Sequence, residues 1–368
     1  MKNLKKPEVI ISAVIALAII AGAVLYFKTP QGNITAARPG GSLLHDEGPA
    51  PEITSPDGYI NTGGKPITFG EFKGKKVVLV DIWTYSCINC QRTLPYIKAW
   101  YDKYSDQGLE IIGIHTPEFS FEKVQKNVED AVERLGIKYP FVLDNEYGTW
   151  NAFGNQYWPR KYLIDVDGNI VYDHIGEGGY EDTEKAIQEA LMDRDAKLGI
   201  SPADVTATSS APENPIDAEF SAIGSPETYF GSARNQYLAN GKESASGIQS
   251  LILPANPELN GLYLGGNWDF FPEYAESSAG GKIVYKYDSK NVYFVASAKD
   301  PSRPVKIKVL VDGKEPGDMH GADIAPDGTG TISESRLYHL LGGENYGTHT
   351  VEIDVIDGTL DAFTFTFG

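Results

Sequence analysis

The sequence predicts one N-terminal transmembrane helix followed by two folded units, an α/β unit at residues 51–198 and an all-β sandwich, jelly-roll-like, at residues 216–368. In the first unit, apolar strand-like runs alternate with helical spacing, which is typical of a sheet with parallel crossovers. In the second, short runs alternate apolar and polar residues between Gly and Asp turns, which is typical of antiparallel strands. A stretch rich in Pro, Ser and Ala at residues 199–215 separates the two as a linker.

The N-terminus has the pattern of a membrane anchor. Residues 1–8 carry three lysines and are followed by an uncharged run at residues 9–27. As a helix this run would extend about 28 Å, close to the hydrocarbon thickness of a bilayer. The lysines should stay in the cytoplasm, so we expect a single-pass protein of the cytoplasmic membrane with most of the chain outside the cytoplasm. A cleavable signal is the alternative, and residues 28–50 read as a tether.

Each element of the first unit is predicted from its own pattern. Two buried strands are expected at residues 75–83 and 109–116, where the apolar residues run almost without interruption. The "DG" pair at residues 167 and 168 predicts the turn of a hairpin. Amphipathic spacing predicts the helices. In chain order these expected elements are helices at 90–106 and 121–137, the hairpin at 160–176 and a closing helix at 180–198.

In the second unit the apolar residues recur at every other position. Val305, Ile307, Val309 and Val311 show this period, which places one face of each strand against a core. The whole chain has a formal net charge of −18. That charge argues against nucleic acid as a partner, since phosphate binding needs basic patches.

Cys87 and Cys90 are the only cysteines of the chain. A structural disulfide between them would close a very short loop and contribute only about 2 kcal/mol. A structural zinc site needs four ligands, and there is no second cysteine pair. The pair therefore predicts a redox-active dithiol, with no other cofactor and no metal. Cys87 lies near a helix start that stabilises a thiolate, and Cys90, one turn further, resolves the mixed disulfide.

The stretch "VLVDIWTYSCINC" resembles a thioredoxin-fold active site, and "HTPEFSFEKVQKNVEDAVERLGIKYPFVLDN" resembles thiol:disulfide interchange proteins of the TlpA type. The stretches "SPETYFGSARNQYL", "GNWDFFPEYAESSAGGKIVYKY" and "THTVEIDVIDG" resemble the C-terminal part of DipZ-type proteins. This resemblance, over about residues 51–368, implies an enzyme that reduces disulfides of client proteins. The family's multi-helix electron-carrying domain has no counterpart here, so a separate membrane donor of the CcdA type is expected.

The resemblance also implies roles for other residues. Asp81 matches the buried acid that takes the proton of Cys90, although it could be a solvated acid at a strand end. Pro159 matches the cis-proline opposite the dithiol, and an ordinary trans proline is the alternative. Trp83 matches an aromatic residue beside the active site, or it is simply core.

Two further residues are supporting candidates. Trp158 directly precedes Pro159. Glu118 follows the second buried strand and could approach the site, but a solvated loop acid is the favoured interpretation.

Two rival functions remain open. In a peroxiredoxin-like thiol peroxidase, Thr84 fits the position three before the reactive cysteine, but position 80 is Val where that signature has Pro. A binding or adhesion protein could instead work through the sandwich. There Trp268 and Phe271, if exposed, could stack on carbohydrate or dock a protein, and if buried they are core.

Overall fold

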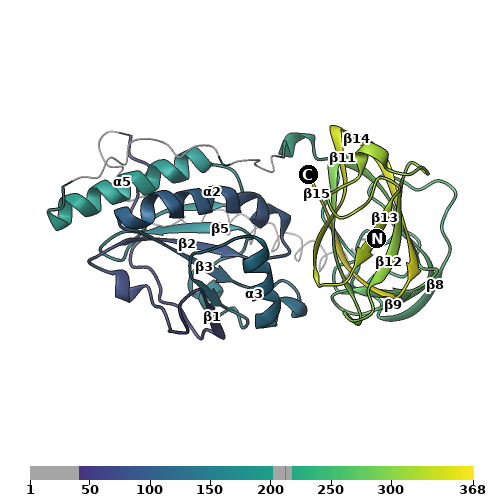
Figure 1. Cartoon of the computed structure of the whole chain (residues 1–368), viewed down its shortest axis with the longest axis horizontal. Coiled ribbons are helices and arrows are strands. Elements are labelled where there is room, and N and C mark those ends of the chain that lie inside the picture. Colours follow the sequence, from purple (N-terminus) through teal and green to yellow (C-terminus); the bar gives the residue numbers. More distant parts are fainter. Residues whose placement is uncertain (1–40, 202–211, 213–217) are drawn as a thin grey trace, which may run out of the picture.

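The computed structural model describes residues 41–201, 212 and 218–368, which form two units joined side by side (Figure 1). The predicted tail and anchor at residues 1–27, and most of the predicted tether and linker, lie outside these residues. Within the described part of the chain, no helix combines the length and apolar character needed to cross a membrane.

The first unit is built on one six-stranded sheet with the order β1-β4-β3-β2-β5-β6. Strands β2, β3 and β4 run parallel, while β1, β5 and β6 are antiparallel to their neighbours. The predicted α/β sheet with parallel crossovers and a late hairpin is therefore confirmed. The strands are β1 (Gly58–Ile60), β2 (Val77–Trp83), β3 (Leu109–His115), β4 (Phe141–Leu143), β5 (Arg160–Ile164) and β6 (Ile170–Ile175).

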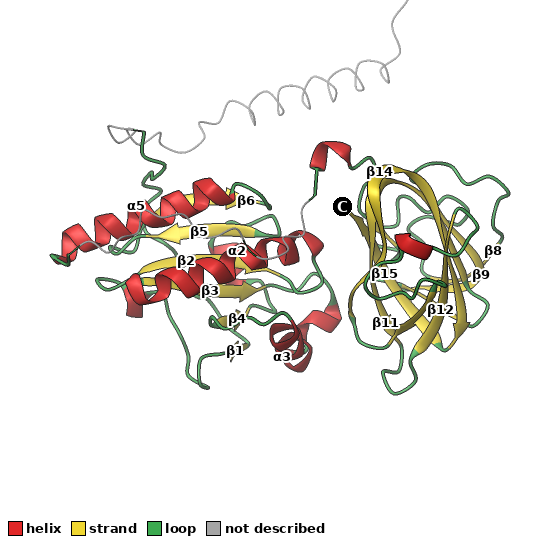
Figure 2. Ribbon diagram, turned by 45° about the horizontal axis from the view of Figure 1, so that its top comes forward, coloured by secondary structure: helices red, strands yellow, loops and turns green. Residues whose placement is uncertain are grey.

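Helices cover both faces of this sheet (Figure 2). Residues of β2 alternate between the faces, so that Val77 and Leu79 contact the core under α2, α3 and α5, while Val78 and Val80 contact the core under η1 and α4. The helices are η1 (Gly70–Phe72), α2 (Ile88–Tyr104), η2 (Ser105–Gln107), η3 (Ser120–Lys123), α3 (Gln125–Arg134), α4 (Gly148–Ala152) and α5 (Tyr180–Leu198).

Two expected segments differ from the observed ones. The predicted helix at 121–137 is split, because Val124 has an extended backbone between η3 and α3. The last residues of the predicted tether are hydrogen-bonded to the first unit and do not form a loose connection. His45 N donates to Val171 O at 2.8 Å and Ala50 N to Gly168 O at 3.0 Å, so residues 45–50 follow the hairpin of β5 and β6.

The named strands of the second unit pair in antiparallel fashion, as predicted, but they form one nine-stranded sheet and not two separate sheets. The reason is the 17-residue strand β11, whose first half pairs with β9 and whose second half pairs with β15. The strands are β7 (Thr228–Tyr229), β8 (Gly247–Leu251), β9 (Leu262–Phe270), β10 (Ala275–Ser278), β11 (Lys282–Ala298), β12 (Val305–Val311), β13 (Thr329–Ile332), β14 (Arg336–Asp357) and β15 (Thr359–Phe367). Short turns of 3-10 helix, η4 (Phe220–Ala222) and η5 (Gly317–Met319), complete the unit.

An apolar cluster joins the two units next to the start of α2. Ile88 and Phe119 of the first unit pack with Val295, Leu337 and Phe363 of the second. The rings of Phe119 and Phe363 meet edge to face at 5.2 Å. Burial of such side chains typically contributes about 1.5–3 kcal/mol each. The contact therefore fixes the second unit against the part of the first that carries the cysteines.

Candidate active site

Cys87 is the N-cap residue of α2. Its Sγ accepts a hydrogen bond from the backbone N–H of Cys90 at 3.3 Å. The Cys87 side chain is partly exposed. A sulfur at this position lies at the positive end of the helix and receives one of its unsatisfied N–H groups, and both effects stabilise a thiolate. The position predicted for Cys87 is thus the observed one.

Cys90 lies one helical turn below and is only 1% exposed. Burial raises the pKa of Cys90 well above its usual value, and the neighbouring Cys87 and Asp81 raise it further. A thiol of this kind stays protonated until a base takes its proton. The two sulfurs therefore differ in the way that attack by Cys87 and resolution by Cys90 require.

Asp81 lies in the middle of β2, on the face that carries Leu79, Trp83 and the core under α2. It is 1% exposed, and burial raises its pKa to about 6. Its Oδ1 has no hydrogen-bond partner among the described groups. The alternative of a solvated acid at a strand end is wrong, because β2 is buried on both faces along its whole length. A buried carboxylate with a free oxygen can accept the proton of Cys90.

Lys161, which the sequence reasoning missed, lies directly opposite Asp81 in the antiparallel register of β2 and β5. Its side chain is fully buried, and Nζ donates to Gly176 O at 3.2 Å. Burial lowers the pKa of Lys161, while Asp81 and Cys90 raise it. Its ammonium lowers the pKa of Asp81 in return. Only the pairing register of two strands 80 residues apart reveals this neighbour.

The bond between Trp158 and Pro159 is cis, as the resemblance implied, and the trans alternative is wrong. Trp158 is partly buried; its Nε1 donates to Thr116 O at 3.0 Å. Its ring lies 4.3 Å from that of Trp150. Trp158 and Cys87 both line a cavity between the two units, which is described below.

Trp83 is completely buried. The centre of its ring lies 5.1 Å from that of Phe141 and 5.6 Å from that of His115. It belongs to the core that also holds Cys90 and does not contribute to the cavity wall. Burial lowers the pKa of His115 to about 3, so this ring is neutral. Its Nε2 lies 3.4 Å from the Thr84 hydroxyl. These residues form the inner support of the active-site loop.

Glu122 connects the loop before α2 to the loop after β3, and sequence reasoning did not identify it. Its Oε1 accepts hydrogen bonds from the Ser86 hydroxyl at 2.7 Å and the Ser86 N–H at 3.2 Å. Its Oε2 accepts from the N–H groups of Glu118 at 2.6 Å and Phe119 at 3.0 Å. The side chain is fully buried. It fixes Ser86, the residue before Cys87.

Replacing Glu122 by glutamine is expected to lower the free energy of unfolding by about 2–4 kcal/mol, because the amide NH2 would face N–H donors and leave buried groups unsatisfied. Urea unfolding at pH 7 measures the effect. Glu133→Gln, which removes an exposed carboxylate from the neighbouring α3, should change it little. Equal urea midpoints for the two variants would show that the four hydrogen bonds are dispensable.

A cavity of about 430 Å³ lies between the two units and has Cys87 in its wall. The first unit supplies the start of α2, Glu118 and Trp158, and the second unit supplies the opposite wall. The lining residues are Cys87, Ile88, Asn89, Arg92, Glu118, Trp158, Phe220, Ile223, Ser225, Glu227, Tyr229, Arg234, Thr366 and Phe367. The partly exposed sulfur is therefore approached from between the units.

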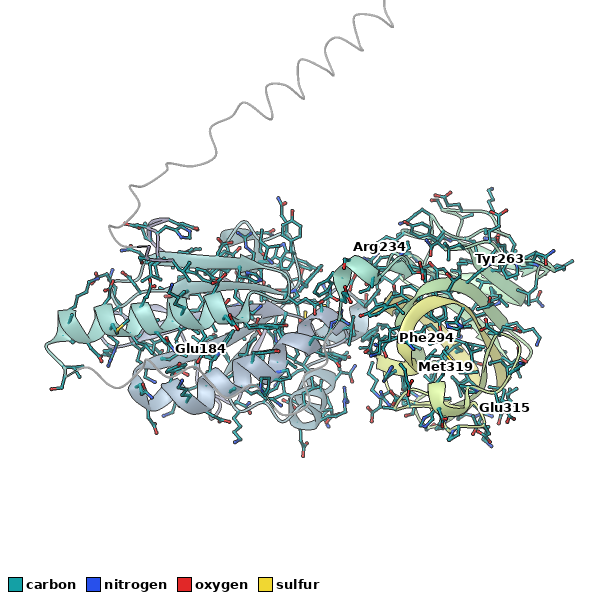
Figure 3. All side chains as sticks on the ribbon, turned by 90° about the horizontal axis from the view of Figure 1, so that it is seen from above. Glu184, Arg234, Tyr263, Phe294, Glu315 and Met319 are labelled. Carbon is teal, nitrogen blue, oxygen red and sulfur yellow. The ribbon has the colours of Figure 1, made fainter. Side chains whose placement is uncertain are left out.

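Glu118 is not a solvated loop acid, so the interpretation favoured by the sequence is wrong. Its Oε1 accepts hydrogen bonds from Tyr229 Oη and from Arg234 Nη1, both at 2.7 Å, and its side chain is 12% exposed. The Arg234 guanidinium stacks 3.7 Å from the centre of the Tyr229 ring. Figure 3 shows Arg234 at the junction of the two units. The partners of Glu118 come from more than 100 residues away, and this is why the sequence favoured a solvated acid.

Arg92, in the second turn of α2, forms an ion pair within the first unit. Its Nε and Nη2 donate to both carboxylate oxygens of Glu177, at 2.7 and 2.9 Å, and its side chain is 2% exposed. Glu177 follows β6, so this bidentate pair ties the redox helix to the hairpin that carries Pro159.

The aromatic group suggested as a docking surface on the second unit is largely inside the protein. Trp268 is completely buried and donates from Nε1 to Gly265 O at 3.0 Å, so its suggested ligand role is wrong. Phe271 is partly buried and stacks on Tyr274 at 4.7 Å, and Tyr274 in turn contacts Phe363 of the interface cluster. These rings support the core and the junction of the units.

Two family models match the chain. Residues 46–191 match the family described as Redoxin, and residues 225–368 match the family described as Thioredoxin like C-terminal domain. The chain is 35% identical over 333 residues to Protein DipZ of Mycobacterium bovis, an alignment that covers 89% of this chain and 44% of that protein. The predicted resemblance is thereby confirmed. The chain spans less than half the length of this relative.

Other similar proteins align with less than half of this chain. Thiol-disulfide oxidoreductase YkuV of Bacillus subtilis is 26% identical over 39% of this chain and 95% of its own length. A solved thiol:disulfide interchange protein of the thioredoxin family from Chlorobium tepidum covers 43% of this chain and 99% of its own, at 23% identity and a TM-score of 0.33.

Proposed function

We propose that this chain, with its thioredoxin-like first unit and DipZ-like second unit, is a thiol–disulfide oxidoreductase that reduces disulfides of client proteins through Cys87 and Cys90. One observation carries the proposal: Cys87 Sγ caps α2 and accepts the Cys90 N–H, while the Cys90 thiol is buried near the carboxyl of Asp81. A helix-capping cysteine alone could form a mixed disulfide but could not release the client from it. The buried Cys90 thiol, with Asp81 as its base, can release the client by attacking Cys87.

The reaction follows from these positions. The Cys87 thiolate attacks one sulfur of the client disulfide, a mixed disulfide forms, and the other client sulfur leaves as a thiolate and takes up a proton. Asp81 then accepts the Cys90 proton, and the Cys90 thiolate attacks Cys87 Sγ. The second client sulfur leaves with a proton, and the protein is left with a Cys87–Cys90 disulfide. Two electrons and two protons have passed to the client.

We further propose that the protein acts outside the cytoplasm, anchored by residues 9–27, and that a membrane donor of the CcdA type returns it to the dithiol form. The support is the uncharged run behind three lysines and the TlpA-type sequence pattern. The rival peroxidase function has less support, because the Thr84 hydroxyl is turned to His115 at 3.4 Å.

The test measures the equilibrium reduction potential of the dithiol and the reduction of insulin by the full chain. A reductant should equilibrate near the thioredoxin value of about −270 mV and an oxidant near about −120 mV. We expect the former, together with insulin precipitation that requires Cys87. A potential near the oxidising value, or no insulin reduction above the dithiothreitol background, would contradict the proposal.

A further inference from the structure

The charged side chains around the cavity form two ion pairs, and one further carboxylate belongs to neither pair. Arg92 is paired with Glu177, and Arg234 is paired with Glu118. Glu227, just before β7, takes part in no ion pair within the described ranges, although it lines the same cavity as Cys87, from the second unit. When Glu227 is ionised, the cavity therefore carries a negative charge that neither pair neutralises.

The side chain of Glu227 is exposed to solvent and lies in the wall of the cavity. Desolvation at this wall and the nearby Glu118 together raise its pKa to about 7, although Tyr229 and Arg234 act to lower it. Above this pH the Glu227 carboxylate is ionised, and the nearby Arg234 guanidinium is already paired with Glu118. A bound cation would supply the positively charged partner that Glu227 lacks. Their attraction would be screened less in the cavity than in open water.

The size of the cavity limits what can reach Cys87. Its volume of about 430 Å³ lies within the range of small-molecule sites, about 300–1,000 Å³. The second unit supplies eight of the fourteen lining residues. Because the apolar cluster around Phe119 and Phe363 fixes the units together, a folded surface has little room to approach. A small disulfide, or a cysteine on an extended segment, fits this space.

We propose that the second unit is part of the substrate site and that Glu227 selects disulfides with a positive charge beside the sulfur. The proposal rests on the disulfide reductase function above and names its substrate class. Two sources offer the same chemistry, a low-molecular-weight disulfide with an amino group, and an extended protein segment with Lys or Arg next to its cysteine. In both, the Cys87 thiolate attacks one sulfur and forms a mixed disulfide with it, while the other sulfur leaves as a thiolate and takes up a proton. The Cys90 thiolate then attacks Cys87 Sγ, which forms the Cys87–Cys90 disulfide and releases the bound sulfur as a thiol.

The test uses the full chain, reduced beforehand and mixed with excess disulfide in a single turnover. Cystamine carries two positive charges and 3,3′-dithiodipropionate two negative charges. We expect cystamine to react faster, and Glu227→Gln to reduce the cystamine-to-dithiodipropionate ratio by about fivefold, as loss of one partly screened ion pair would. Glu315→Gln removes the same charge from the second unit at a distance from Arg234 (Figure 3) and should leave the ratio unchanged.

Two matched peptide disulfides, with Lys or with Glu on both sides of the cysteine, distinguish the sources. Selection among the peptides indicates protein segments, and selection confined to the small compounds indicates low-molecular-weight disulfides. In the unmodified chain the ratio should also fall as the pH is lowered through about 7, where Glu227 takes up a proton in the presence of Glu118, Tyr229 and Arg234.

A ratio that is the same in the unmodified chain and in Glu227→Gln, and that does not change with pH, would overturn the inference. Equal loss of the ratio in Glu315→Gln would also overturn it, since the overall negative charge would then account for the preference. If none of the disulfides is reduced, the proposed function itself fails. Reduction of all of them without charge preference overturns only the role of Glu227.

Discussion

Replacing Cys90 by serine is expected to abolish turnover and to leave client molecules covalently attached to Cys87. The reason lies in the geometry of α2. Cys87 is partly exposed at the N-cap and keeps its ability to attack, whereas the buried thiol that resolves the mixed disulfide is gone. Non-reducing gel electrophoresis followed by mass spectrometry detects the adducts, which dithiothreitol should release.

Cys87→Ser is the matched control, because it should neither turn over nor trap clients. Alkylation adds a second readout, since Cys87 of the reduced protein should react faster than Cys90, which is 1% exposed. If Cys87→Ser traps clients as well as Cys90→Ser does, the assignment of nucleophile and resolving thiol is reversed.

Replacing Asp81 by asparagine is expected to slow resolution of the mixed disulfide by about 100-fold, a typical effect of losing a general base. Initial attack by Cys87 should change much less, because the helix cap that stabilises its thiolate is intact. Stopped-flow measurement of tryptophan fluorescence or of client thiol release separates the two steps. Asp102→Asn, on an exposed part of α2, is the control and should leave both steps unchanged.

The pH dependence gives a second readout for Asp81. Burial raises its pKa to about 6, so the carboxylate that accepts the proton is present above this pH and lost below it. Resolution in the unmodified chain should therefore slow as the pH falls through about 6. The rate of resolution in Asp81→Asn should not show this fall near pH 6. If the rates of attack and of resolution are both unchanged in the variant, Asp81 has a structural role only.

The same raised pKa predicts the sign of a stability effect. Ionising a group whose pKa is raised on folding destabilises the native state, and the penalty is present at pH values above the folded pKa. Asp81→Asn should therefore be more stable than the unmodified chain at pH 7, by about 1–3 kcal/mol. The gain in stability is reduced because the buried ammonium of Lys161 loses its carboxylate neighbour in the variant. The difference should disappear near pH 4.

Local pattern by itself determined much of this protein. The spacing of Cys87 and Cys90 after an apolar strand indicated a helix-capping dithiol, and the observed helix begins at Ile88. Alternation at Val305 to Val311 predicted buried faces on β12, and all four alternating residues are buried. These features depend on residues within one or two turns of each other, so period and propensity are sufficient to predict them.

Tertiary structure alone decided what surrounds the sulfur. Asp81 faces Lys161 through strand register, Glu118 finds Arg234 across the junction of the units, and Trp268 is covered completely. In the sequence each of these is an isolated polar or aromatic residue, for which a solvated or ligand-binding role is as consistent as a buried one. Whether such a residue is paired, covered or left open depends on contacts between segments far apart in the chain, and local periodicity carries no information about those contacts.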